Sequence, residues 1–168
     1  MRRVLSILVD NQAGVLSRIS GLFSRRGYNI DSLSVGETED PAFSRITVVV
    51  RGDDLTLTQI ARQVEKLADC RELTELSADA SVCRELALVK INAAASDRSD
   101  IFGVVEIFRA SIIDVSNASI TVELTGDENK IAAFMELMRP YGVIEMARTG
   151  LTGLMRGPSS LRKDPNIG

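Results

Sequence analysis

The residues best suited to bind a ligand stand together near the start of the chain, in the stretch Asp10-Asn11-Gln12-Ala13-Gly14. The apolar run VLSILV before them predicts a strand, and the apolar spacing after them predicts a helix that starts at about Ala13 or Gly14. The first turn of a helix has backbone N–H groups without partners, and the helix dipole adds positive potential there. This arrangement predicts a site for a carboxylate or a phosphate.

Two asparagines and a glycine are suited to complete such a site. Gly14 has no side chain to block a ligand's approach to the backbone, and Asn11 offers both a donor and an acceptor. Asn29, where the next strand is expected to start, is suited to hold an ammonium or amide group. A second interpretation involves no ligand: Asn11 and Gly14 form a turn and a helix cap, and Asn29 follows Gly27 because asparagine tolerates such corners. The residues alone leave both interpretations open.

Composition excludes several classes of function. The chain has 168 residues, a net charge of −3 and no histidine, so neither a basic surface for nucleic acid nor a metal site is expected. Its two cysteines, Cys70 and Cys83, have no CxxC spacing and are predicted to be reduced packing residues. None of the common phosphate-binding, hydrolase or metalloprotease motifs occurs. A binding module is therefore favoured over a catalyst, and we predict no catalytic residues.

Location can also be predicted from the sequence. No apolar run approaches the roughly 20 residues that cross a bilayer. The N-terminus lacks the regions of a signal peptide. We therefore expect a cytoplasmic protein.

The order of predicted elements is βαββαβ, and it occurs twice. Apolar periodicity and turn residues place the first set at about residues 4–9, 14–26, 30–35, 43–51, 53–68 and 71–76. They place the second set at about residues 86–91, 101–108, 112–115, 120–124, 127–139 and 143–147. The pattern predicts an α+β protein with two ferredoxin-like domains joined near Ser77–Ser81.

Both helices of such a domain cover one face of the sheet, and the other face stays open. The first strand is apolar on both faces, because Leu5, Ile7 and Val9 alternate with Val4 and Leu8. We therefore expect the open face to be covered by the other domain, a second copy of the chain or a larger protein. Beyond Gly150, the Gly, Pro and Ser content predicts a tail that is ordered only if it docks.

Several segments together resemble one known family. They are RRVLSILVDNQAGVLSRISGLFSRRGYNIDSLSVGETEDPAFSRITVVVRGDD, the REL and LVKI runs between residues 84 and 91, EIFRASIIDVS and EMARTGLTGLMRG. Over about 155 residues the chain resembles the small, regulatory subunit of bacterial acetolactate synthase, also called acetohydroxyacid synthase. The resemblance implies an N-terminal ACT domain over residues 1–78, a C-terminal ferredoxin-like domain over 79–156 and a flexible tail over 157–168.

The resemblance also implies a site and a ligand. ACT domains of this family pair side by side into a continuous sheet, and a branched-chain amino acid, typically valine, binds between them. Carried over to this chain, one copy contributes the loop and helix start, and the neighbouring copy contributes the start of a strand. The expected effector-binding residues are Asn11, Gln12, Ala13, Gly14, Val15 and Leu16 from one copy and Asn29 and Ile30 from the other.

The implied function is regulation. The small subunit of this family has no catalytic residues and no cofactor of its own. Its partner, the catalytic large subunit, holds thiamine diphosphate, magnesium and FAD. A chain of this kind raises the partner's activity and makes it subject to feedback inhibition. The preference among valine, leucine and isoleucine, the oligomer beyond a dimer, the surface that meets the partner and the role of the second domain stay open.

The sequence disfavours three other functions. An acylphosphatase-type phosphate site needs an arginine in the first loop, where this chain has Asp10-Asn11-Gln12. An RNA-binding βαββαβ module needs aromatic side chains on its central strands, and aromatics make up only 4% of the chain. An ACT domain with a different partner is disfavoured, because the match continues beyond Ser81 into the second domain.

Overall fold

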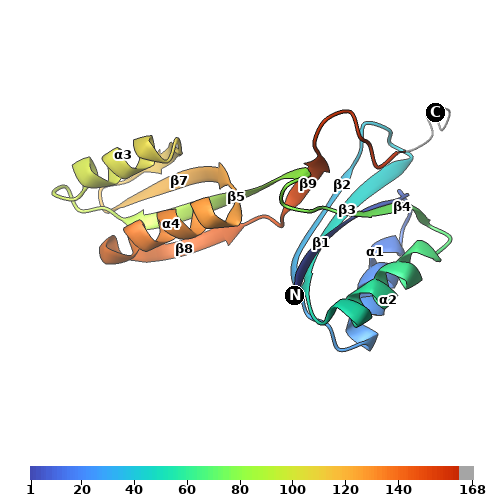
Figure 1. Ribbon diagram of the computed structural model, residues 1–168. Coiled ribbons are helices and arrows are strands. Elements are labelled where there is room, and N and C mark those ends of the chain that lie inside the picture. Colours follow the sequence, from blue (N-terminus) through green and yellow to red (C-terminus); the bar gives the residue numbers. More distant parts are fainter. Residues whose placement is uncertain (163–168) are drawn as a thin grey trace. The chain divides into compact units, whose positions relative to one another are not determined.

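The computed structural model describes residues 1–162, which form two compact units (Figure 1). The first unit consists of Met1–Cys83 and the chain from Gly150 onward, and the second consists of Arg84–Thr149. Each contains an antiparallel sheet with two helices on one face, in the order βαββαβ. The predicted α+β class with two ferredoxin-like units is confirmed.

The first unit has a four-stranded sheet in the order β2-β3-β1-β4. Its elements are β1 (Arg2–Asp10), α1 (Val15–Arg25), β2 (Ile30–Glu37), β3 (Phe43–Arg51), α2 (Asp54–Glu65) and β4 (Cys70–Glu75). Side chains along the two central strands, β1 and β3, alternate between the two faces of the sheet. Those on one face meet the helices and form the core. Those core side chains are Leu5, Ile7 and Val9 from β1 and Ile46, Val48 and Val50 from β3.

Local sequence signals set the ends of these helices. Gly27 follows the C-terminal end of α1 and has a φ of 71°, a conformation that glycine adopts without strain and that stops the helix. Asp53 caps α2, because its carboxylate accepts a hydrogen bond from the N–H of Thr56 at 2.9 Å. Both helix ends are thus set by residues that lie next to them in the sequence.

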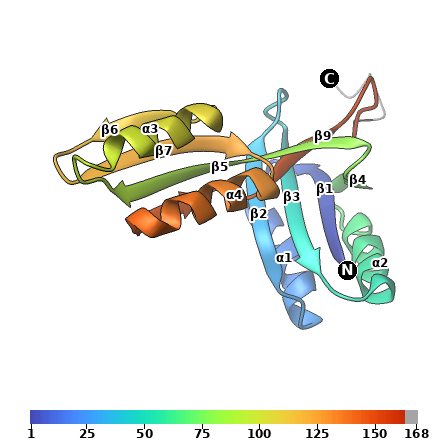
Figure 2. The same cartoon turned by 60° about the vertical axis from the view of Figure 1, so that its left-hand side comes forward.

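The second unit has the strand order β6-β7-β5-β8, of which Figure 2 labels β6, β7 and β5. Its elements are β5 (Ser81–Asn92), α3 (Arg98–Ile107), β6 (Ser111–Val115), β7 (Ser119–Gly126), α4 (Glu128–Met138), a 3-10 turn (Arg139–Tyr141) and β8 (Val143–Arg148). Asp127 caps α4 through the N–H of Lys130 at 2.8 Å, and the α-helix ends just before Pro140. Phe134 is fully buried in the core and meets the ring of Phe108 edge-on at 5.5 Å.

The chain's own end covers much of the sheet face that the helices of the first unit leave free. We call residues 150–162 the C-terminal segment. Leu151 packs with Val4, Val49 and Leu76 on that face, and Leu161 packs there with two further residues, Leu8 and Phe43. Between these contacts, β9 (Thr152–Met155) pairs with β5. We expected another domain, a second copy of the chain or a larger protein to cover this face. For this part of the face the expectation is corrected, because the chain's own C-terminal segment covers it.

The C-terminal segment also changes the expected domain bounds. The sequence placed residues 79–156 in the second domain, whereas the structure assigns the chain from Gly150 to the first unit. The physical reason is the burial of Leu151 and Leu161, each 4% exposed, against the first sheet. Within the expected flexible tail, residues 157–162 therefore include a docked leucine. Residues 163–168 lie outside the described part of the chain.

Candidate functional site

The predicted ligand loop connects β1 to α1, and its helix start is uncapped. Residues 11–14 are exposed, and Gly14 is the N-cap with a φ of 85°. No side chain caps the helix, and its first turn contains no acidic residue. The first bond into the helix runs from the N–H of Arg18 to the carbonyl of Gly14 at 3.0 Å, so the N–H groups ahead of it have no partner within the helix. This end of α1 offers donors and positive potential to solvent.

Asn11 fixes this loop to the hairpin formed by β2 and β3. Its side-chain amide donates to Glu37 Oε2 at 3.2 Å and to the carbonyl of Pro41 at 2.9 Å. Its Oδ1 accepts from the hydroxyl of Ser44 at 3.0 Å, and its backbone N–H donates to Ala42. Both amide hydrogens are therefore used within the chain. Asn11 therefore has the turn-forming role that its residue type allowed. To hold an effector as well, its side-chain amide must exchange Glu37 or Pro41 for the ligand.

Two ion pairs flank the loop. Arg71 donates to both carboxylate oxygens of Asp10 at 2.6 Å, and these hydrogen bonds raise the pKa of Arg71 above its ordinary value. On the helix side, Arg18 Nη2 lies 2.6 Å from Asp69 Oδ2. A Cβ atom built on Gly14 would lie 3.1 Å from Arg18 Nη1. A guanidinium therefore stands directly beside the uncapped helix start, which adds to the attraction for a carboxylate.

Val15, Leu16 and Ile30, the larger apolar members of the expected effector-binding set, have different environments. Val15 is 3% exposed and belongs to the core of the first unit, so its side chain does not face an open site. Ile30 is partly buried against the same core. Leu16 is 39% exposed and is free to contact a ligand. Of these three, only Leu16 presents an apolar surface at the helix start; Gln12 and Ala13 beside it are exposed.

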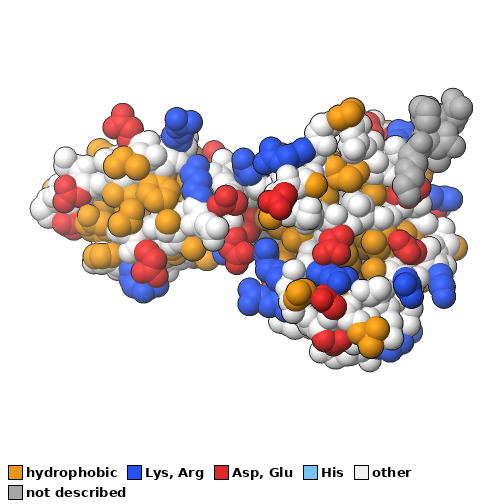
Figure 3. Space-filling view, viewed as in Figure 1, with side chains coloured by type: hydrophobic (Ala, Val, Ile, Leu, Met, Phe, Trp, Pro, Cys, Tyr) orange, Lys and Arg blue, Asp and Glu red, His pale blue; other side chains and the backbone are white. Residues whose placement is uncertain are grey.

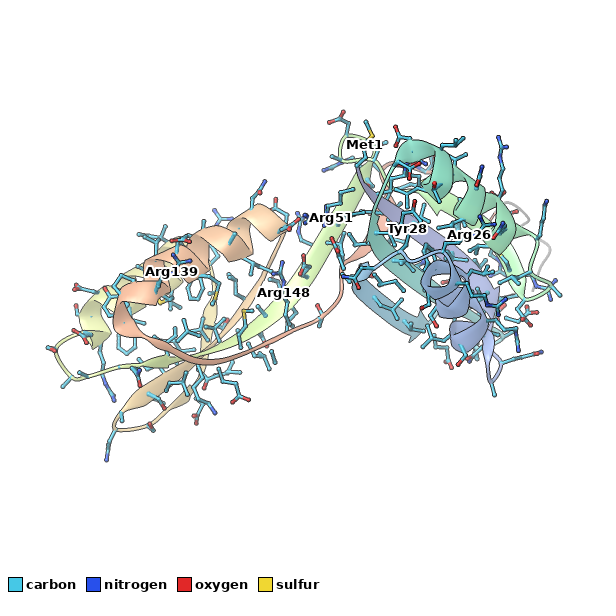
Figure 4. All side chains as sticks on the ribbon, turned by 90° about the horizontal axis from the view of Figure 1, so that it is seen from below. Met1, Arg26, Tyr28, Arg51, Arg139 and Arg148 are labelled. Atoms are coloured by element: carbon cyan, nitrogen blue, oxygen red, sulfur yellow. The ribbon has the colours of Figure 1, made fainter. Side chains whose placement is uncertain are left out.

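Within one copy of the chain, the eight predicted residues form two groups at opposite ends of α1. Asn11 to Leu16 lie at its start, and Asn29 and Ile30 follow its end, beside Tyr28 (Figure 4). Eleven residues of helix separate the groups by about 16 Å at 1.5 Å per residue. Tyr28 packs across Gly52 and donates to Asp53 at 2.7 Å, which fixes the far end of the helix. One copy therefore does not bring all eight residues together.

The hollows of the first unit lie away from the predicted ligand loop, and the sequence did not indicate them. Two of them, of about 290 and 260 Å³, adjoin the C-terminal segment and share Glu39, Arg45 and Leu154 in their linings. The available signal was the charge of Arg45 inside the apolar strand FSRITVVV. Its significance depends on the strand register and on the C-terminal segment, which no local pattern gives.

Other kinds of site are not found in residues 1–162. They contain no group of three or more His, Cys, Asp or Glu side chains placed to hold a metal ion. No helix there is long and apolar enough to cross a membrane. Neither Cys70 nor Cys83 forms a disulfide within the described residues, and burial raises the pKa of the Cys70 thiol to about 11, so it stays protonated near neutral pH. Lys and Arg are interspersed with Asp and Glu on the visible face of each unit (Figure 3).

Comparison with known proteins decides the family. A family model described as "Small subunit of acetolactate synthase" matches residues 84–157, and one described as "AHAS small subunit-like ACT domain" matches residues 5–72. The chain belongs to the acetolactate synthase small-subunit family. The ACT domain thus lies within the first unit and includes all eight predicted site residues, whereas the other match extends from the second unit into the C-terminal segment.

Individual members of the small-subunit family match along nearly the whole chain. A probable acetolactate synthase small subunit of Methanothermobacter thermautotrophicus is 47% identical over 159 residues, which are 94% of this chain and 95% of that protein. The acetolactate synthase small subunit of Bacillus subtilis is 47% identical over 158 residues, covering 94% and 92% of the two chains. The crystal structure of the Thermotoga maritima small subunit superposes with a TM-score of 0.86 at 40% identity, over 95% of this chain and 99% of that one.

Proposed function

We propose that this chain is a regulatory subunit without catalytic residues, which activates the catalytic large subunit of acetolactate synthase and makes it sensitive to feedback. In this proposal the effector is a branched-chain amino acid, with valine first, and the site of action is the cytoplasm. Thiamine diphosphate, magnesium and FAD belong to the large subunit, and this chain holds no cofactor. Membership of the small-subunit family supports the regulatory role.

The uncapped start of α1 is the observation that carries the ligand proposal. An amino acid presents a carboxylate, and the N–H groups near Gly14 and Val15 are placed to donate hydrogen bonds to it. Arg18 adds a positive charge beside them. Leu16 supplies exposed apolar surface for a branched side chain. An apolar contact separates valine from leucine or isoleucine by only about 1 to 3 kcal/mol, so leucine and isoleucine are expected to compete with valine for the same site.

The separation of the two predicted groups supports a site shared by two copies of the chain. Asn29 and Ile30 lie at the far end of α1 from Gly14, so a second copy must supply them to a site that contains both. We propose a homodimer through the ACT domains, in which an edge strand of one sheet pairs with that of its partner. The first sheet has two edges, β2 and β4, and β2 begins at Ile30.

A shared site explains how binding is transmitted. A ligand changes an equilibrium between two arrangements only by binding them with different affinity. An amino acid held between two copies contacts residues whose relative position depends on the dimer arrangement. Valine therefore favours the arrangement that brings both groups together, and the large subunit responds to that choice. Allosteric coupling of this kind is typically about 1 to 3 kcal/mol.

The test uses the holoenzyme reconstituted from both subunits, with acetolactate formation measured at increasing L-valine. Gly14→Asp is expected to abolish inhibition and to leave activation of the large subunit intact, because its carboxylate repels that of the effector. Gly14→Asn is the matched control: it imposes the same Cβ atom and the same positive φ without the charge. It is expected to retain inhibition. Inhibition that persists in Gly14→Asp would place the effector site elsewhere.

Binding is measured separately by calorimetric titration of the small subunit with L-valine, L-leucine, L-isoleucine and an unrelated amino acid. A saturable heat with valine that is reduced in Gly14→Asp, but not in Gly14→Asn, is the expected result. Heat that is equal in both variants and in the natural chain would contradict the proposed carboxylate contact.

A further inference from the structure

The open face of the first sheet has a polar centre between two apolar contacts. Leu151 anchors the C-terminal segment on one side and Leu161 anchors it on the other. Between these anchors lie the two hollows of about 290 and 260 Å³. The shared lining of Glu39, Arg45 and Leu154 makes them neighbouring lobes around one guanidinium.

Arg45 is held in place by a neutral partner. It lies on β3, opposite Leu8 of β1 and Gly36 of β2, and its side chain points to the face that the helices do not cover. Its Nη1 donates to the hydroxyl of Ser6 at 2.9 Å, and Ser6 is fully buried. Burial lowers the pKa of Arg45 from its ordinary value, and the nearby charge of Glu39 offsets part of this effect.

Arg45 differs from the other well-covered arginines of this unit in having no ion pair with any residue of the described chain. Arg3, whose side chain is 19% exposed, contacts Asp54 at 3.0 Å. Arg162, at 26%, contacts Asp40 at 3.3 Å. A covered guanidinium without a carboxylate loses hydration and regains little, so its position is unfavourable unless an anion joins it.

The lining of the hollows limits the kind of anion. Hydroxyl groups line both lobes beside Arg45. Those of Ser34 and Thr152 in one lobe and of Thr74, Ser159 and Ser160 in the other can donate to oxygen atoms. The hydroxyl of Thr38 already donates to the carbonyl of Asp40 at 2.9 Å. Glu39 disfavours a multiply charged anion such as phosphate and is suited to meet an ammonium group. Leu154, 59% exposed, offers an apolar contact.

We propose that Arg45 and the surrounding hydroxyl groups form a second binding site, distinct from the helix-start loop, for a small molecule with a single carboxylate. The carboxylate lies against the Arg45 guanidinium beneath the C-terminal segment. Two sources share this chemistry: a simple carboxylic acid, and an amino acid whose ammonium group meets Glu39. The site is built within one copy of the chain, and it does not depend on the function proposed above.

Calorimetric titration of the full-length protein with isobutyrate and with L-valine tests the site, because the two probes share a branched carbon skeleton and differ in the ammonium group. Thermal unfolding with and without each probe gives a second readout. The test variant is Arg45→Met, which keeps the length of the side chain and removes its charge. Arg51→Met, at the end of the same strand (Figure 4), is the matched control; Arg51 is exposed and pairs with Asp31 at 2.6 Å.

Binding of at least one probe is expected, with affinity at least about tenfold weaker in Arg45→Met and unchanged in Arg51→Met. Gly14→Asp is expected to leave this Arg45-dependent binding intact. Binding of isobutyrate as tight as that of valine identifies a simple carboxylate as sufficient. Binding of valine alone identifies the amino acid as the source.

A control for folding keeps the test decisive. Arg45→Lys retains the charge and the hydrogen bond to Ser6, so it is expected to recover part of the affinity lost in Arg45→Met. Equal binding by Arg45→Met and the natural chain would overturn the proposal, as would the absence of saturable heat and of thermal stabilisation with both probes. Loss of all binding in Gly14→Asp would also overturn it, because the probes would then occupy only the helix-start loop.

Discussion

Asp69 holds the guanidinium of Arg18 beside the start of α1, with Arg18 Nη2 at 2.6 Å and Nε at 2.8 Å from the same carboxylate oxygen. The third nitrogen, Nη1, lies 3.1 Å from the position that a Cβ atom on Gly14 would occupy. One acidic residue thus orients a cation toward a glycine that leaves the backbone accessible. The loop is prepared for an anion before any ligand arrives, which lowers the cost of ordering the site on binding.

Removing this cation should weaken the effect of valine. We expect Arg18→Met to raise the valine concentration that half-inhibits the reconstituted holoenzyme by about tenfold or more, because a charge-assisted hydrogen bond contributes about 1.5 to 3 kcal/mol. Arg71→Met is a matched control: the two arginine side chains are 48% and 49% exposed, and each pairs with one aspartate. An equal effect of both variants would indicate a general loosening of the loop and not a contact with the effector.

Acid should weaken the cap of α2. The N–H of Thr56 and then the hydroxyl of Tyr28 hold the pKa of Asp53 at about 2, below its ordinary value of 3.8. A carboxylate whose pKa is lowered by folding stabilises the protein fully above about pH 4, and this contribution is lost as the pH falls toward 2. The urea midpoint should therefore drop less between pH 5 and pH 2.5 in Asp53→Asn than in the natural chain. An identical drop in both proteins would contradict the role given to this carboxylate.

The core of the second unit should depend on one aromatic ring. Phe134 is fully buried and meets Phe108 edge-on, so Phe134→Ala leaves a cavity and is expected to cost about 3 to 5 kcal/mol of unfolding free energy. Leu137→Ala, one turn further along the same helix at a site that is 48% exposed, should change it by less than about 1 kcal/mol. Urea unfolding followed by circular dichroism measures both. Similar losses for the two variants would show that α4 packs differently.

Replacing Gly150 or Gly103 by alanine should change the free energy of unfolding in opposite directions. A Cβ atom on Gly150 would lie 2.3 Å from the carbonyl oxygen of Leu33, so Gly150→Ala is expected to displace the C-terminal segment and to cost about 1 to 3 kcal/mol. Gly103 lies inside α3, where such a Cβ would have no atom within 4 Å apart from the nearby backbone of its own helix, and Gly103→Ala should stabilise the second unit by about 0.5 to 1 kcal/mol. Melting temperatures measure both. A stabilised Gly150→Ala would show that the segment does not approach Leu33.

Local chemistry made much of the fold predictable from the sequence. Asp53 and Asp127 cap helices because a short carboxylate reaches an N–H three residues ahead, and Gly27 ends a helix because it adopts a positive φ. These causes act within a few residues, so a local pattern reports them. Alternation along β1 likewise separated Leu5, Ile7 and Val9, which form the core, from Val4 and Leu8 on the other face.

The parts that the sequence did not reveal depend on distant contacts. Leu161 lies in a stretch rich in Gly, Pro and Ser, and its burial depends on Leu8 and Phe43, more than a hundred residues earlier. The hydrogen bonds that join Asn11 to Glu37 and Ser44 depend on the hairpin register, so the loop sequence alone does not predict them. The burial of Val15 depends on how α1 is rotated against the sheet. Such features follow from packing and not from propensity.

The return of the chain to the first unit at Gly150 has a consequence for synthesis. A ribosome makes residues 1–83 first, then the whole second unit, and only then Leu151 and Leu161. During that interval Val4, Leu8, Phe43 and Val49 have no Leu151 or Leu161 to cover them, although both helices of the first unit have already been made. The unit that begins translation is therefore the last to be finished, and its nascent form carries an apolar surface that must avoid other chains until the final residues emerge.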